Sequence, residues 1–534
     1  MAKPFATVLE PATSLQNKTG SWKTLCPKYM SKLPPCNAAC PAGEDIQKWV
    51  SYAQEGKFKE AWETIVENNP FPAVMGRVCY HTCEKVCNRG QFDGSISINL
   101  LERSIGTIAI ERKWNFENPQ QSSGKKVLVI GAGPSGLSAA YFLRKKGHDV
   151  IVYETHMKPG GMMRYGVPKY RLPRDVMDAE IKRIHDLGIN IICNKHVSKL
   201  KDEIPNFDAV YIAVGAYLAT ERNVETKNGC CVIDAIDLFR KLEDSPDDVP
   251  NLGKSVIVYG GGNTAIDAAR TALRLGAASV KIIYRRTMNK MSAHDTEIQD
   301  ALAEGVEILC LRSISSIDGG KVLTNKMTYD EASDVLAQSG ETEILEADYT
   351  IFAIGQSIDE GILSGIDGIT ISEKGAIEID KNMMTGTAGI FAGGDVIHNK
   401  RTVTHAIGYG KKAAKCIDAY LKGKEAASNE KGDIAIYKTL NTAYFKKNPK
   451  TEISKSTNIS FEENDVSLSE KEIIQESDRC FSCGNCFNCD NCYAYCPDNA
   501  IIKHADGTLE INHDYCKGCG ICASECPCGA IKMG

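Results

Sequence analysis

The sequence predicts an α/β protein in which two doubly wound domains lie between two small cysteine-rich domains. A buried strand, a glycine turn, a helix and a second strand follow one another over residues 125–154. The same order returns over residues 254–286, which predicts two Rossmann-like dinucleotide-binding domains in tandem. Most of the 22 cysteines flank these units, with six in residues 26–87 and eleven in the last 55 residues.

The composition is that of a globular protein and excludes several other classes. Hydrophobic residues make up 43% and charged residues 25% of the 534 residues, so the chain is not disordered. The net charge of −5 leaves no basic excess for binding nucleic acid. The longest apolar runs are far shorter than the ~18 residues of a membrane span, and the N-terminal residues lack the apolar core of a secretory signal. We therefore expect a cytoplasmic chain, in which clustered cysteines indicate metal ligands rather than disulfides.

A glycine turn between a strand and a helix, GAGPSG at residues 131–136, is the first candidate cofactor site. Such a turn presents backbone N–H groups and the positive end of a helix to a pyrophosphate. Gly131 allows the tight bend, Gly133 the approach of the phosphate and Gly136 the contact between helix and strand. Glu154 ends the second strand, where a carboxylate accepts hydrogen bonds from ribose hydroxyls. We predict that a dinucleotide binds to Gly131, Gly133, Pro134, Ser135, Gly136 and Glu154.

The second glycine turn, GGGNTA at residues 260–265, has no acidic residue after its second strand. Arg285 and Arg286 stand there instead, and arginine pairs with an adenosine 2′-phosphate that an acid would repel. NADP(H) is therefore favoured over NAD(H). NAD(H) stays open, because these arginines can instead stack on adenine or face solvent. The predicted nicotinamide site consists of Gly260, Gly262, Asn263, Thr264, Ala265, Arg285 and Arg286.

The C-terminal cysteines follow the spacing of a two-cluster ferredoxin. Cys486-x2-Cys489-x2-Cys492-x3-Cys496-Pro is followed by the same spacing from residue 516 to 527. The fourth cysteine of each run binds the other cluster, and zinc sites need neither this spacing nor the proline. We predict one [4Fe–4S] cluster on Cys486, Cys489, Cys492 and Cys526 and a second on Cys516, Cys519, Cys522 and Cys496. Cys480, Cys483 and Cys528 belong to neither ligand set. All three can be packing residues, and Cys480 and Cys483 can instead be ligands of a further cluster.

Later segments resemble the flavoproteins that have two dinucleotide-binding domains. GIFAGGD at residues 389–395 is similar to the motif whose aspartate holds the flavin ribityl chain, and the segment after residue 160 is similar to one that lies beside FAD. AVG at 213–215 and AIG at 353–355 resemble the two chain crossings between the domains. The resemblance implies that FAD occupies the first site. It adds Gly161, Met162, Arg164, Val214, Gly215, Ala353, Gly355, Gly394, Asp395 and Thr404 to the cofactor-binding residues.

The N-terminal cysteine segments resemble the iron–sulfur domain of the glutamate synthase small (β) subunit family. The similar segments are PCNAACPAG, NPFPAVMGRVCYHTCEKVCNRG and SINLLERS, and the FAD and NAD(P) motifs follow in the family's order. The resemblance covers about residues 30–420. It implies a [4Fe–4S] cluster on Cys40, Cys79, Cys83 and Glu102, where a carboxylate replaces the fourth thiolate.

The family's second N-terminal cluster has an incomplete set of ligands in this sequence. Cys36 and Cys87 match two ligands, but the Cys-x2-Cys that precedes the position of Cys36 in the family is missing. Either Cys26 replaces a missing ligand, or Cys480 and Cys483 supply both thiolates across the fold. The sequence therefore predicts one or two N-terminal clusters.

These observations divide the chain into five parts. They are an N-terminal helical iron–sulfur domain (1–122), a discontinuous FAD-binding domain (123–222 and 345–422), an NAD(P)H-binding domain (223–344), a connector (423–475) and a 2[4Fe–4S] ferredoxin-like α+β domain (476–534). Apolar residues at helical spacing over 43–69 and 99–113 support the first part. We expect residues 1–30 to form an extended arm and the connector to lie over the surface.

Together the motifs predict an NAD(P)H-dependent iron–sulfur flavoprotein oxidoreductase. NAD(P)H donates a hydride, a cluster accepts one electron at a time, and a flavin converts between the two. We expect electrons to move between NAD(P)H, FAD and the clusters, to or from ferredoxin or a larger redox-enzyme subunit in a hetero-oligomer. Hydride transfer needs no general acid or base, so no catalytic residue is assigned, and His81, His294 and His405 are expected to be structural.

Other functions remain open on the sequence alone. The same motifs suit the electron-input subunit of a glutamate synthase or a flavin-based electron-bifurcating subunit. A thiol–disulfide reductase needs a cysteine pair near the flavin, and none follows Gly161, while Cys230 and Cys231 lie outside any motif. A scaffold that only docks partners would show no reduction of flavin by nicotinamides.

Overall fold

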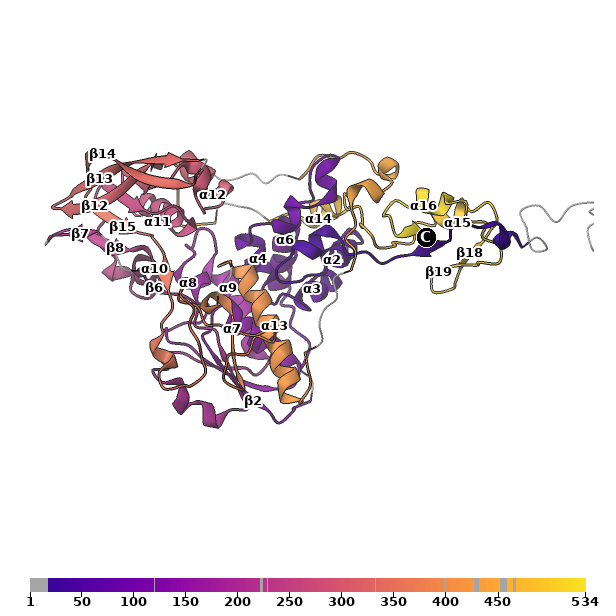
Figure 1. The fold of residues 1–534 in the computed structure, drawn as a ribbon, viewed down its shortest axis with the longest axis horizontal. Helices are drawn as coiled ribbons and strands as arrows, with labels where there is room; N and C mark the ends of the chain where they lie inside the picture. The colour runs from indigo at the N-terminus through magenta and orange to yellow at the C-terminus, as the bar shows by residue number, and fades with distance from the viewer. Residues whose placement is uncertain are drawn as a thin grey trace, which may run out of the picture.

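The computed structural model describes residues 18–119, 121–220, 224–227, 229–331, 333–397, 400–426, 432–451, 459–463 and 467–534. In Figure 1 the helical N-terminal domain lies in the centre, with one α/β domain below it and the other at the upper left. The small C-terminal domain, in yellow, lies on the opposite side of the helical domain from the second α/β domain. Among the helices of the described residues, none is long and apolar enough to cross a membrane. Most of the predicted arm, residues 1–17, lies outside the described residues.

The helical domain contains the predicted N-terminal helices. Its helices are α1 (Pro35–Ala39), α2 (Ile46–Gln54), α3 (Phe58–Val66), α4 (Pro72–Val78), α5 (Thr82–Lys85) and α6 (Ile98–Glu111). The helical spacing over 43–69 becomes two helices, because Gly56, with a φ of +71°, turns the chain between them. Helices α4 and α6 touch through glycine: a Cβ at Gly76 would lie 2.2 Å from the Arg103 Cα.

The first α/β domain is built on a five-stranded parallel sheet with the order β17–β5–β2–β3–β4. Its strands are β2 (Lys126–Ile130), β3 (Asp149–Tyr153), β4 (Asn190–Ile192), β5 (Ala209–Ile212) and β17 (Ile390–Ala392). The main helices are α7 (Pro134–Lys145), α9 (Arg174–Asp186) and α13 (Val403–Leu421). Because β17 and α13 come from late in the sequence, the domain is discontinuous.

The second α/β domain has the parallel order β11–β10–β9–β15–β8. Its strands are β8 (Val232–Asp234), β9 (Ser255–Tyr259), β10 (Ser279–Tyr284), β11 (Glu307–Cys310) and β15 (Tyr349–Phe352). Its helices are α10 (Ala235–Asp244), α11 (Asn263–Arg274) and α12 (Asp295–Ala303). Strand β15 pairs with β9, so the chain returns to the first domain after Phe352 and not at residue 345.

A second sheet in this domain was not expected from the sequence. It has the order β14–β13–β12–β7 and consists of β7 (Glu225–Thr226), β12 (Arg312–Asp318), β13 (Lys321–Asp330) and β14 (Val335–Glu346). The two chain crossings pair as a short antiparallel ribbon, β6 (Leu218–Ala219) with β16 (Gln356–Ser357).

The C-terminal domain incorporates a strand from the other end of the chain. Its own elements are α15 (Asn491–Ala494), β18 (Ile501–Lys503), β19 (Leu509–Ile511), α16 (Ile521–Ser524) and β20 (Ile531–Met533). Strand β1 (Pro27–Tyr29) pairs antiparallel with β20. Helix α14 (Glu470–Ser477) precedes this domain and packs on α2 of the helical domain. The N-terminal arm therefore ties the two cysteine-rich domains together.

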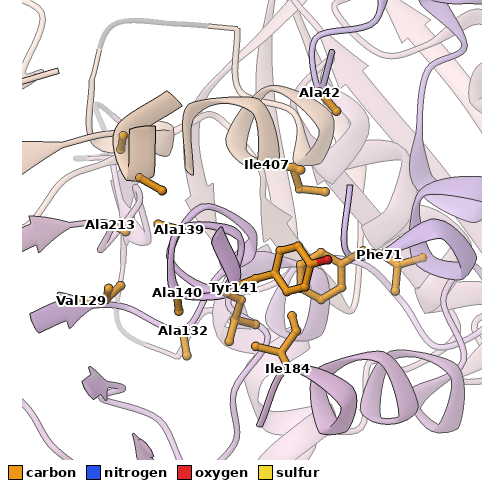
Figure 2. Close-up of a cluster of buried hydrophobic side chains, with 14 of the residues drawn as sticks. Ala42, Phe71, Val129, Ala132, Ala139, Ala140, Tyr141, Ile184, Ala213 and Ile407 are labelled. Carbon is orange, nitrogen blue, oxygen red and sulfur yellow. The ribbon is translucent and has the colours of Figure 1, made fainter. Parts of the chain in front are cut away.

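The helical domain and the first α/β domain share one hydrophobic core, shown in part in Figure 2. Phe71 of the helical domain and Tyr141 and Ile184 of the first α/β domain point toward one another there. The Tyr141 hydroxyl donates a hydrogen bond to the Val66 carbonyl oxygen at 2.9 Å. The second α/β domain and the C-terminal domain each have separate cores. The helical domain is thus fixed to the first α/β domain by burial of apolar surface.

Candidate functional site

The first glycine turn joins β2 to α7 at a cavity in the first α/β domain. Gly131 has a φ of +101°, and a Cβ there would lie 2.5 Å from the Ala213 carbonyl oxygen. A Cβ at Gly136 would lie 1.9 Å from the Gly131 carbonyl oxygen, so only glycine lets α7 begin so close to β2. By contrast, the nearest atom to a Cβ at Gly133 is 3.7 Å away, and Gly133 lines the cavity together with Pro134 and Ser135. The turn leaves its backbone open on the side where the start of a helix attracts a phosphate.

Glu154 is buried at the end of β3 and lines the same cavity. Its two carboxylate oxygens accept hydrogen bonds from the backbone N–H groups of Ala132 (2.8 Å) and His156 (2.9 Å). These bonds fix the side chain beside the glycine turn, and each oxygen keeps a lone pair for a ribose hydroxyl. Glu154 can therefore hold the turn and bind a nucleotide at the same time.

Asp395 follows β17 and presents an unpaired acceptor to the cavity. Its Oδ1 atom is buried and has no hydrogen-bond partner among the described residues. Burial raises the pKa of Asp395 to about 6, against the opposing charge of Arg401. A buried polar atom without a partner costs about 1–3 kcal/mol, and a hydroxyl of a bound polyol would remove that cost. The residues of this cavity therefore fit FAD, whose ribityl chain carries such hydroxyls.

The segment after β3 packs directly on the glycine turn. The Gly160 N–H donates to the Ala132 carbonyl oxygen at 2.8 Å, and a Cβ at Gly161 would lie 2.6 Å from the Gly133 Cα. Besides Gly161, the predicted residues Met162, Val214, Gly215 and Gly394 line the cavity. This close packing explains why the segment and the turn form one wall.

Two residues predicted for FAD lie outside the two cofactor cavities. Arg164 is buried, pairs with Glu243 at 3.0 Å across to α10, and also pairs with Asp178. The Thr404 hydroxyl points to a sulfur instead and donates to the Cys79 Sγ at 3.3 Å. Each nevertheless lies two residues along the chain from a residue that lines the first cavity. That residue is Met162 for Arg164 and Ala406 for Thr404. Arg164 ties the two α/β domains together, and Thr404 connects α13 to the cysteines of the helical domain.

The second glycine turn lines a cavity of about 720 Å³ in the second α/β domain. Gly260 has a φ of +155°, and a Cβ there would lie 2.3 Å from the Ala353 carbonyl oxygen. Asn263 Oδ1 accepts a hydrogen bond from the His294 N–H at 2.9 Å, which fixes the start of α11. Ala265 is fully buried behind the turn. The predicted residues that line this cavity are Gly260, Gly262, Asn263, Thr264, Arg285, Arg286, Ala353 and Gly355.

Arg285 and Arg286 follow β10 at the edge of this cavity. Within the described part of the chain, neither guanidinium group has an ion-pair partner within 4.0 Å, and the buried Nε of Arg286 has no hydrogen-bond partner. Arg285 is exposed, whereas Arg286 is half-buried. Unpaired guanidinium groups at this position fit a phosphate on the ribose of a dinucleotide.

The two cavities meet, and the same side chains form a common wall. Pro134, Met162, Ile236, Asp395 and Ala406 line both. A dinucleotide bound to each glycine turn would therefore direct its far end toward the other. Such an arrangement permits direct hydride transfer between a nicotinamide and a flavin.

The first cysteine set lies beside this common wall. Cys79 stands between Val78 and Tyr80, which line the second cavity. Burial first, and then the neighbouring thiols of Cys79 and Cys40, raise the pKa of Cys83 well above its usual value. Burial, Glu44 and then Cys79 raise the pKa of Glu102. The sequence predicted Cys40, Cys79, Cys83 and Glu102 as one ligand set, and in the structure Cys79 affects the pKa of both Cys83 and Glu102.

Glu44 is a buried carboxylate at this set that the sequence analysis missed. Asn69 Nδ2 donates to both Glu44 Oε1 (2.9 Å) and Glu102 Oε1 (2.8 Å). Trp49 Nε1 donates to Glu44 Oε2 at 3.3 Å. No motif marks Glu44, because its position next to Glu102 depends on Asn69, which donates to both carboxylates from elsewhere in the chain.

The remaining N-terminal cysteines form a second set with two C-terminal ones. Cys36, Cys87, Cys480 and Cys483 line one cavity. Cys26 lies elsewhere, where its backbone pairs with Gly534 at the edge of the C-terminal domain. Of the two alternatives for the second N-terminal cluster, the structure brings together the one that uses Cys480 and Cys483.

The ferredoxin-type cysteines form two further sets that cross between the two motifs. One cavity is lined by Cys496, Cys516, Cys519 and Cys522. The other is lined by Cys486, Cys489, Cys492 and Cys526, together with Cys528. Among the described residues, no group of three or more His, Cys, Asp or Glu side chains is placed as the ligands of a single metal ion would be. Each set surrounds a cavity instead, as thiolates around a cluster core do.

The other candidate groups lie outside the cysteine sets. His294 stacks on Tyr80 with ring centroids 5.2 Å apart, and His405 Nδ1 lies 2.8 Å from the Thr402 hydroxyl at the start of α13. His81 begins α5 with a φ of +53°. Cys230 donates to the Ile317 carbonyl oxygen in the antiparallel sheet. That His81, His294 and His405 are structural stays a prediction.

Comparison with known protein families agrees with this domain order. Residues 125–410 match the pyridine nucleotide-disulphide oxidoreductase family. Residues 25–114 match the family of dihydropyrimidine dehydrogenase domain II with its 4Fe-4S cluster, and residues 485–530 match the 4Fe-4S dicluster domain.

Three curated relatives illustrate the range of proteins to which the chain is similar. It is 36% identical to the NADP(+)-dependent formate dehydrogenase subunit beta of Moorella thermoacetica, over 73% of this chain and 60% of that protein. It is 30% identical to the NADPH-Fe(3+) oxidoreductase subunit beta of Geobacter sulfurreducens, over 84% of this chain and 75% of that one. It is 32% identical to the NAD-dependent dihydropyrimidine dehydrogenase subunit PreT of Escherichia coli K12, over 73% of this chain and 91% of the relative.

Proposed function

Because the chain belongs to the pyridine nucleotide-disulphide oxidoreductase family, we propose that it carries electrons from NADPH through FAD and [4Fe–4S] clusters to a partner redox protein. The chain is an NAD(P)H-dependent iron–sulfur flavoprotein oxidoreductase, since iron–sulfur families match on both sides of the flavoprotein family. The observation on which the proposal rests is the common wall of the two cavities, with Cys79 beside it.

FAD is proposed for the first cavity. The open backbone at Gly133 and the start of α7 would bind the pyrophosphate, and Glu154 would bind ribose hydroxyls. Asp395 would pair its free Oδ1 with the ribityl chain. Bound there, FAD would supply the conversion of one hydride into two single electrons. Met162 lines both cavities and would lie between the two bound cofactors.

NADPH is proposed for the second cavity, in preference to NADH. The support is the pair of guanidinium groups without ion-pair partners in the described residues, at the place where NAD-binding domains carry an acid. Two of the relatives are named for NADP or NADPH, and PreT is named for NAD. The names therefore agree with either nicotinamide, and the preference depends on Arg285 and Arg286.

Three [4Fe–4S] clusters are proposed on the cysteine sets that the sequence predicted in full. The first would use Cys40, Cys79, Cys83 and Glu102, next to the flavin cavity. The others would use the crossed ferredoxin ligands in the C-terminal domain, which lies on the opposite side of the helical domain from the second α/β domain (Figure 1). Electrons would thus enter at the common wall and leave through the C-terminal domain.

A partner subunit is proposed at the C-terminal domain. The curated relatives include subunits of formate dehydrogenase and of an NADPH-Fe(3+) oxidoreductase, which supports a hetero-oligomer. Phe487, Tyr493 and Tyr495 are exposed beside the cysteines of this domain. Exposed aromatic side chains next to a redox centre suit a surface that a second protein covers.

An anaerobic assay of the cluster-loaded chain tests this function. We expect NADPH to reduce a viologen dye faster than NADH does, with the flavin bleached in both cases. A chain that holds FAD and iron but reduces no dye with either nicotinamide would contradict the proposed relay. Faster reduction with NADH would contradict the assignment of Arg285 and Arg286 alone.

A further inference from the structure

Four cysteines from opposite ends of the sequence line one cavity, and the proposed relay uses none of them. Cys36 lies in α1 and Cys87 follows α5, while Cys480 and Cys483 follow α14. Cys87 and Cys480 are 393 positions apart in the sequence. The rest of the wall is mainly apolar and includes Ile46, Val50, Ile96, Ile98 and Phe481.

A buried network of charged groups fixes the second pair of cysteines against the helical domain. Arg479 donates to Glu476 at 2.6 Å, and the same Glu476 oxygen accepts the Ser97 N–H at 2.8 Å. Arg89 donates to the Arg479 carbonyl oxygen at 2.5 Å. Glu476 and Arg479 have 0% and 1% of their surface exposed, so breaking this network would leave unpaired charges inside the protein. The backbone around Cys480 therefore has one well-defined position.

The cavity also offers hydrogen bonds to sulfur. Asn88 Nδ2 donates to the Cys483 Sγ at 3.4 Å, and the Ser482 N–H donates to the Cys480 Sγ at 3.5 Å. Arg89 lines the cavity, while its guanidinium group pairs with Asp93 at 2.6 Å. N–H donors stabilise thiolates, which are the form of cysteine that binds iron.

We propose that Cys36, Cys87, Cys480 and Cys483 together hold a fourth [4Fe–4S] cluster, shared between the helical domain and the segment that precedes the C-terminal domain. The site goes beyond the proposed function, because the sequence left Cys26 and the pair Cys480 and Cys483 as alternatives, and the cavity selects the pair. Two ligands from each end of the chain complete a four-thiolate set that neither end provides alone.

The chain connections place this site between the flavin-side set and the C-terminal sets. Cys36 and Cys40 lie at the two ends of α1, and Cys83 and Cys87 lie in and just after α5. The first and second sets are therefore held by the same two short helices. On the other side, only two residues separate Cys483 from Cys486, a ligand of a C-terminal set. A cluster here would pass single electrons from the helical domain to the C-terminal domain.

Iron counting tests the proposal without relying on turnover. The wild-type chain, prepared anaerobically, is expected to hold about sixteen iron ions per FAD, against about twelve if only three [4Fe–4S] clusters form. The double variants C36S/C87S and C480S/C483S are each expected to lose about four iron and four sulfide ions. The quadruple variant should lose no more than either double variant, because all four residues serve one cluster.

Matched variants separate this site from the alternatives. C26S removes the other candidate ligand and C231S an exposed cysteine outside every set, so both should keep the wild-type iron content. FAD content and bleaching of the flavin by NADPH should stay at wild-type levels in all variants, which shows that they fold and that the proposed function is tested separately. Unchanged iron in C480S/C483S, a loss in C26S, additive losses in the quadruple variant, or zinc in place of iron would each overturn the proposal.

Discussion

Arg286→Ala is expected to impair the use of NADPH strongly and the use of NADH very little. The guanidinium group is half-buried at the edge of the second cavity, and its Nε has no hydrogen-bond partner among the described residues. A 2′-phosphate on the ribose would accept charge-assisted hydrogen bonds from it. NADH has no such phosphate, so each measurement contains its own control.

The burial of the two arginines sets the size of the effect. A hydrogen bond to a charged group contributes about 1.5–3 kcal/mol, and each 1.4 kcal/mol is a factor of ten. Arg286→Ala should therefore lower kcat/KM for NADPH about 10- to 150-fold. Arg285 is exposed, where an ion pair contributes about 0–1 kcal/mol, so Arg285→Ala should cost about fivefold or less. The effect of Arg285 should also shrink at high salt.

The assay is steady-state viologen reduction under anaerobic conditions with each nicotinamide. The loss should fall on KM more than on kcat, because the phosphate is bound equally in the ground and transition states. Arg312→Ala is the control: it removes the same charge from the same domain, where Arg312 pairs with Glu343 outside the cavity. Equal losses for NADPH and NADH in Arg286→Ala would refute a phosphate contact.

Three further predictions follow from the first α/β domain. Gly136→Ala places a Cβ 1.9 Å from the Gly131 carbonyl oxygen and should lower both thermal stability and FAD content. The nearest atom to a Cβ in Gly133→Ala is 3.7 Å away, so this variant should lower FAD affinity alone. Thermal unfolding of the FAD-free and FAD-loaded chains distinguishes the two effects. Asp395→Ala should lower FAD affinity about 10- to 150-fold in a flavin titration, because one charge-assisted hydrogen bond is lost, and wild-type affinity would argue against a ribityl contact. Burial raises the pKa of Glu180 from 4.5 to about 7, so the folded chain binds the Glu180 proton more tightly than the unfolded chain does. The stability that the bound proton contributes is fully present below pH 4.5 and is lost as the pH rises to about 7. Glu180→Gln should therefore flatten the fall in unfolding free energy between pH 5 and about 7 in urea titrations, and an unchanged slope would contradict the assignment.

Features that depend on neighbouring residues were predictable from the sequence. The glycine turns are local, because a strand, a bend and a helix start must meet within a few residues to bind a phosphate. The Cys-x2-Cys-x2-Cys-x3-Cys-Pro spacing is local for the same reason, and the exchange of the fourth cysteine between runs follows from the motif itself. The grouping of Cys40, Cys79, Cys83 and Glu102 required a resemblance to a family, since no spacing rule joins them.

Features that depend on packing between distant segments were not predictable. Arg164 has the position of a flavin contact in the sequence, yet its buried side chain pairs with Glu243 of the other α/β domain. Strand β15 has the same local character as the strands of the first domain, but its hydrogen bonds with β9 place it in the second sheet. A strand's pattern specifies burial and not which sheet it joins.

The sequence by itself determined the two dinucleotide turns, the C-terminal 4Fe-4S dicluster domain and the class of redox chemistry, because contiguous residues define each of them. Only the tertiary structure decided that Cys480 and Cys483 face Cys36 and Cys87, that β1 completes the C-terminal domain, and that the two cofactor cavities share one wall. These relations depend on which apolar surfaces pack together, and burial of apolar surface does not depend on separation along the chain.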